Sequence, residues 1–138
     1  MRKFVSFKRA TNLSLAIFGL FIMFHLAIII GIVIFNYVPI DFLWGGRMET
    51  RNQLLGFEFI SLIVMAFCIL IVLIHSERIR IPKLKNVVQI ALWILFAMFV
   101  LNTLGNIIAK TMFEKFLAVV TAILSILCLR LALEKNQK

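Results

Sequence analysis

The chain has 138 residues, of which 63% are hydrophobic, and its mean hydropathy is +1.08. Its apolar residues occur in runs long enough to cross a bilayer, which excludes an ordinary soluble domain. The formal net charge is +9, from 15 Lys and Arg against 6 Asp and Glu. These basic residues lie in short segments between the apolar runs, so they favour a role in membrane orientation over binding to nucleic acid.

Four apolar runs predict four transmembrane helices, at about 13–38, 54–75, 87–109 and 113–133. The first run follows a basic segment, as in a signal peptide, but it is too long for a cleaved signal, so we expect it to be retained. Only a few residues separate the last two runs, which predicts an antiparallel hairpin. We expect one domain over 1–138: an all-α integral membrane protein, built as an antiparallel bundle of four transmembrane helices.

The distribution of Lys and Arg predicts the orientation of this bundle. Most of these residues lie before the first run, in the basic connector around Pro82, and at the C-terminal end. Because cytoplasmic segments carry the excess of positive charge, we expect both termini in the cytoplasm and the connector 39–53 outside it.

The connector 39–53 is polar, aromatic and glycine-rich in an otherwise apolar chain. Pro39 ends the first helix, and the run Trp44-Gly45-Gly46-Arg47 contains a turn. This run can act only as an aromatic anchor and a turn. Alternatively, two glycines before an arginine expose backbone donors beside a cation, which suits an anion or a lipid head group.

A carboxylate inside an apolar run is a functional hypothesis by default, because a charge in the hydrocarbon core costs about 2.5 to 3.5 kcal/mol. Glu58 is such a residue, about four positions from the start of its expected helix. Several other polar residues lie within about two turns of the same outer surface. We predict an outward-facing polar pocket for a ligand, formed by Glu58, Arg47, Asn102, Asn106, Trp44 and Asn36. His25 is expected to lie deeper and isolated, near the midplane.

Each of these residues also has a purely structural interpretation. Glu58 can pair with Arg47 or Lys110 and so fix the connector to the bundle. Asn102 and Asn106, one helical turn apart, can form interhelical hydrogen bonds, each worth about 0.6 kcal/mol.

His25 and two cysteines also lie inside the apolar runs. His25 has a side chain suited to a proton relay, or it can bond to Ser125 or to a backbone carbonyl. Cys68 and Cys128 have no neighbouring His or Cys in the sequence, so we expect them to be small packing residues.

Two short motifs carry a resemblance to a known kind of protein. The run Leu43-Trp44-Gly45-Gly46-Arg47 and the run Leu101-Asn102-Thr103-Leu104-Gly105-Asn106 resemble patterns of a family of small four-span bacterial membrane proteins of uncharacterised function. The resemblance implies a multi-pass protein of the bacterial cytoplasmic (inner) membrane and supplies no activity. The short multidrug transporters also have four spans and a membrane carboxylate, but theirs lies in the first helix.

Two functions remain open on the sequence. The first is a binding or accessory role for a lipid head group, a small ligand or a partner membrane protein. The second is a small homo-oligomeric ion channel or proton-coupled transporter that uses Glu58. The inner halves of the second and third runs are almost wholly apolar, which argues against the second function. No catalytic motif or metal-ligand spacing is visible, so an enzyme activity has no positive support but stays open. We expect no cofactor and no metal, and as partners the bilayer with a second copy of the chain or a partner membrane protein.

Overall fold

A computed structural model of the chain describes residues 5–134. These residues form four α-helices and no strand, and each helix is long and apolar enough to cross a membrane. The helices are α1 (Phe7–Ile34), α2 (Arg51–His75), α3 (Lys85–Ile107) and α4 (Met112–Ala132). The prediction of an all-α chain with four long apolar helices is therefore confirmed.

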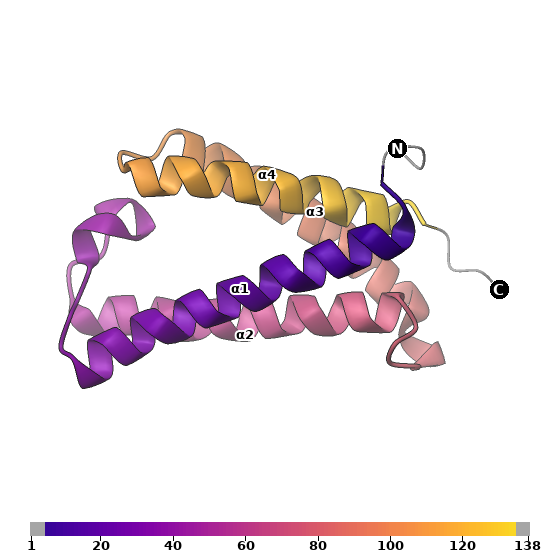
Figure 1. Cartoon of the computed structure of the whole chain (residues 1–138), viewed down its shortest axis with the longest axis horizontal. Helices are drawn as coiled ribbons and strands as arrows, with labels where there is room; N and C mark the ends of the chain where they lie inside the picture. Colours follow the sequence, from indigo (N-terminus) through magenta and orange to yellow (C-terminus); the bar gives the residue numbers. More distant parts are fainter. Residues whose placement is uncertain (1–4, 135–138) are drawn as a thin grey trace.

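The helices run up and down and form two pairs, α1 with α2 and α3 with α4 (Figure 1). The start of α1, the end of α4 and the connector between α2 and α3 lie at one end of the bundle, which we call the terminal end. The connector 35–50 and the short link 108–111 lie at the opposite end, which we call the loop end. The two pairs approach closely at the terminal end and diverge toward the loop end, where the connector 35–50 folds between them (Figure 1).

The helix boundaries at the loop end differ from those predicted. α1 ends at Ile34, and Asn36 then adopts a left-handed conformation with φ of 51°. α2 begins at Arg51 because Thr50 and Gln53 form a capping box. The side chain of each residue accepts a hydrogen bond from the backbone N–H of the other. The connector is therefore 35–50 rather than 39–53, and α1 begins and ends earlier than the predicted run 13–38.

Large apolar side chains fill the middle of the bundle and its terminal half. Phe18 packs against Phe99 with ring centroids 5.7 Å apart, and both rings are buried. The free thiols of Cys68 and Cys128 are fully buried in the same cluster, as expected for packing residues. This apolar layer separates the polar groups of the loop end from those of the terminal end.

Polar contacts tie the helices together at the terminal end. The buried Arg130 donates from Nε to the Val5 carbonyl at 2.9 Å and forms an ion pair with Glu134 at 2.7 Å. At the start of α3, Lys85 contacts Glu77 of the preceding connector at 2.8 Å, and its hydrogen bond and positive charge lower the pKa of that exposed carboxyl.

Candidate functional site

The buried carboxylate of Glu58 joins two helices and the connector 35–50. One of its oxygens lies 2.6 Å from Nδ1 of His25, on α1. The other accepts a hydrogen bond of 2.9 Å from the indole N–H of Trp44. Glu58 is only 1% exposed, so both of its oxygens are satisfied by the protein rather than by bulk water.

The position of His25 corrects two predictions. His25 is not isolated, and it, rather than Arg47, is the partner of Glu58. The cause is the helix boundaries: His25 lies nine residues before the end of α1, about 13 Å at 1.5 Å per residue. Glu58 lies seven residues after the start of α2, about 10 Å. The two side chains therefore reach nearly the same depth.

A second buried carboxylate, Glu114 on α4, holds the same connector. Glu114 accepts a hydrogen bond from the backbone N–H of Gly45 and another, of 2.8 Å, from the Thr111 hydroxyl. The Thr111 hydroxyl in turn accepts from the Glu114 backbone N–H at 3.2 Å and caps α4. The sequence interpretation missed Glu114. The Thr-x-x-Glu spacing was the available signal, because it marks a helix start whose carboxylate faces back toward the preceding segment.

Between these carboxylates the chain makes a tight left-handed turn over Trp44, Gly45 and Gly46. Their φ angles are 55°, 70° and 65°. The turn places the indole of Trp44 toward Glu58, against the ring of Phe57 at 5.2 Å between centroids. Its backbone donors are used internally, since Gly46 N–H bonds to the Leu43 carbonyl at 3.0 Å. The turn is therefore not the open anion-binding loop that the glycines indicated.

Replacing Gly45 with Ala is expected to lower the free energy of unfolding by about 1 to 2 kcal/mol, the cost of a left-handed conformation for a residue with a Cβ. The added Cβ has room, with Nε of Arg47 at 3.6 Å and Oε1 of Glu114 at 3.8 Å, so the cost is conformational. The matched control is Gly19→Ala in α1, where nothing lies within 4 Å. The free energy of unfolding of that variant should rise by up to about 1 kcal/mol. Unfolding titrations that give both variants the same sign would contradict this account of Gly45.

A cavity of about 150 Å³ lies beneath the turn, between all four helices. Both carboxylate residues line it, together with His25, two asparagines and several aromatic residues. Its lining residues are Phe21, Phe24, His25, Leu43, Trp44, Glu58, Ser61, Met65, Phe99, Asn102, Asn106, Phe113, Glu114, Leu117 and Thr121. We call this hollow the acidic cavity.

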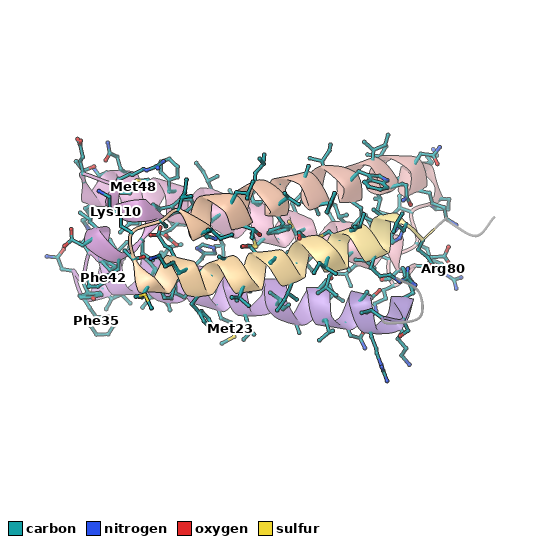
Figure 2. The ribbon with its side chains drawn as sticks, turned by 90° about the horizontal axis from the view of Figure 1, so that it is seen from above. Met23, Phe35, Phe42, Met48, Arg80 and Lys110 are labelled. Atoms are coloured by element: carbon teal, nitrogen blue, oxygen red, sulfur yellow. The ribbon has the colours of Figure 1, made fainter. Side chains whose placement is uncertain are left out.

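An open groove of about 580 Å³ adjoins the acidic cavity on the other side of the turn. Its cations are Arg47 and Lys110, both exposed, and Lys110 projects at the loop end of the molecule (Figure 2). The groove is completed by Gly45, Gly46, Gly105, Ile108 and Ala109, and it shares Trp44, Asn102, Asn106 and Glu114 with the acidic cavity. We call it the basic groove.

The predicted pocket residues thus fall into three groups. Glu58, Trp44, Asn102 and Asn106 line the acidic cavity, together with His25. Arg47 lines only the basic groove. Asn36 lines neither hollow and is exposed beyond the end of α1.

The chain matches no protein-family model, no curated protein and no solved structure. The resemblance to small four-span bacterial proteins therefore stays a prediction. Within residues 5–134, no group of three or more His, Cys, Asp or Glu side chains is arranged to hold a metal ion.

Proposed function

We propose that the chain is a multi-pass membrane protein that binds a small polar ligand from the outer side, in the acidic cavity. Four long apolar helices support the membrane location, as do large apolar side chains that are exposed in mid-helix, such as Met23 and Ile63. The excess of Lys and Arg at the terminal end supports an orientation with both termini in the cytoplasm and the loop end outside.

The observation that carries the proposal is the pair of buried carboxylates, Glu58 and Glu114, on one cavity. They come from different helices, and each contacts two donors, one of which belongs to the connector 35–50. A carboxylate has room for about four hydrogen bonds, so each keeps acceptor capacity toward the cavity. Fixed polar groups that converge in an aromatic hollow are typical of a ligand site.

One observation favours a second function, proton-coupled transport. The contact of Glu58 with His25 joins an acid and a base inside the bundle. The apolar layer around Phe18 and Phe99 opposes this function, because large apolar side chains and a few uncharged hydroxyls, such as those of Ser14 and Ser125, fill the bundle between the acidic cavity and the terminal end.

Modification of an engineered cysteine tests access to the acidic cavity. Ser61 lines the cavity, so Ser61→Cys in intact cells should react with an impermeant cationic methanethiosulfonate added outside. Ser125→Cys is the matched control, since Ser125 is buried and does not line the cavity. It should stay unmodified, as should the two buried native cysteines. Labelling of Ser61→Cys only in inverted vesicles would refute the orientation, and no labelling from either side would refute the open cavity.

Ion flux in liposomes separates binding from transport. The binding function predicts no flux above that of empty liposomes. Flux that is present in the wild-type protein and lost in Glu58→Gln would instead establish the transport function. Equal flux in both proteins would exclude Glu58 from the permeation path.

A further inference from the structure

We infer that the ligand is the ethanolamine phosphate head group of a membrane phospholipid, with its ammonium in the acidic cavity and its phosphate in the basic groove. This inference rests on the proposed function and names the ligand of the same site. Its basis is the juxtaposition of two hollows of opposite charge that share one wall, formed by Trp44, Asn102, Asn106 and Glu114.

The acidic cavity suits a small primary ammonium. Its carboxylates, Glu58 and Glu114, can accept hydrogen bonds from the three donors of such a group. Its aromatic wall includes Phe24 and Phe113, whose rings pack at 5.5 Å and whose faces attract cations. The volume of about 150 Å³ lies below the ~300 to 1,000 Å³ of a pocket for a drug-sized molecule. It therefore has room for a small group such as aminoethyl, and a drug-sized molecule does not fit.

The basic groove suits the phosphate. The exposed cations of Arg47 and Lys110 line it, and both side chains can donate to phosphate oxygens. A Cβ placed on Gly45 would lie 3.6 Å from Arg47 Nε and 3.8 Å from Glu114 Oε1, so the guanidinium and the carboxylate flank the same residue. A ligand that passes Gly45 from the acidic cavity to the basic groove therefore meets the Glu114 carboxylate first and the Arg47 guanidinium second. An ammonium joined to a phosphate by two carbons carries its charges in the matching order.

The surface beside the basic groove indicates a lipid rather than a soluble zwitterion. The groove is lined by Gly105, in the last turn of α3, and by Ile108, just after it, and both residues are exposed. The same face of α3 continues toward the terminal end with exposed Leu101, Ala97 and Ile94. An acyl chain can lie along this apolar face while the head group remains in the groove. Gly105 lies about 3 Å below the end of α3, at the level where head groups meet the hydrocarbon.

Trp44 provides a reporter for this binding, because it lines both hollows. The other tryptophan, Trp93, is exposed on α3 away from them, so Trp93→Phe leaves a single indole. We would titrate the full chain with Trp93→Phe, in detergent micelles, with dihexanoyl phosphatidylethanolamine. The comparison ligands are the phosphatidylcholine and phosphatidylglycerol of the same chain length, and free phosphoethanolamine.

Phosphatidylethanolamine should give a saturable change in Trp44 emission, with at least tenfold higher affinity than the other three ligands. Choline cannot donate to the carboxylates, glycerol carries no positive charge, and the free head group lacks acyl chains. Arg47→Gln with Lys110→Gln should weaken binding roughly tenfold, the effect of losing charge-assisted contacts. Lys115→Gln should leave it unchanged, because Lys115 is exposed at the same end but lines neither hollow. Glu58→Gln should remove most of the preference for ethanolamine over glycerol.

Equal affinity for all three lipids would overturn the assignment of ethanolamine. Equal affinity for free phosphoethanolamine and the lipid would overturn the lipid assignment. Either result would leave the proposed function in place, because the labelling of Ser61→Cys measures access to the acidic cavity independently of this ligand.

Discussion

Replacing Glu58 with Leu is expected to lower the free energy of unfolding by about 3 kcal/mol, the typical cost of breaking a buried pair by removing one partner. The substitution leaves Nδ1 of His25 and the indole N–H of Trp44 without their acceptor in a largely buried site. Equilibrium unfolding in mixed micelles of mild detergent and sodium dodecyl sulfate measures the loss.

Two further variants separate the effect of the pair from the effect of the carboxylate. Glu58→Gln keeps an oxygen for Trp44 and should lose less stability than Glu58→Leu. His25→Leu combined with Glu58→Leu should lose less than the sum of the two single changes, with a coupling of about 1 to 3 kcal/mol, because each single variant leaves an unpaired group. Strict additivity would show that the 2.6 Å contact between His25 and Glu58 does not stabilise the bundle.

Replacing Glu114 with Ala should release the connector 35–50 from α4. The variant loses the acceptor for Gly45 N–H and Thr111 hydroxyl while the apolar layer remains intact. A hydrogen bond to a charged group is worth about 1.5 to 3 kcal/mol, so amide exchange at Gly45 should accelerate roughly 10- to 100-fold. Hydrogen exchange of the protein in micelles, followed by mass spectrometry, gives this rate.

Glu49→Ala is the matched control for this experiment. Glu49 lies in the same connector and is exposed, and only its backbone N–H is bonded, to Gln53. Exchange at Gly45 should therefore be unchanged in Glu49→Ala. If both variants accelerate exchange equally, a general loss of negative charge at the loop end is responsible, and the contact between Glu114 and Gly45 is not.

The sequence predicts the four helices well because the apolar runs are long and the breaks between them are polar. The ends of the helices are harder to predict from the sequence, because a run of apolar residues does not mark where the helical backbone ends. Val38 reads as part of the first run, yet α1 ends at Ile34. Because α1 ends about one turn earlier than predicted, His25 lies at the depth of the Glu58 carboxylate. His25, rather than Arg47, is therefore the partner of Glu58.

The gathering of polar residues at one end of the bundle was predictable, and their pairing was not. Glu58, Asn102 and Asn106 were placed together by helical depth, and all three line the acidic cavity. Glu114 was overlooked because it belongs to the first turn of its helix, where an acidic residue has a capping role in many proteins. Its contact with Gly45 depends on the left-handed turn, whose path no local pattern specifies.

The four helices differ in length, and this affects how the bundle fits a bilayer. α1 has 28 residues and α4 has 21, which corresponds to about 42 Å and 32 Å. In the proposed membrane location, a hydrocarbon core of about 30 Å would match α4, and α1 would tilt or project beyond it. The connector 35–50 leaves from the end of α1, and its Gly45 bonds to Glu114 in the first turn of α4. In the proposed membrane location, a change in bilayer thickness that alters the tilt of α1 would therefore strain the contact between Gly45 and Glu114.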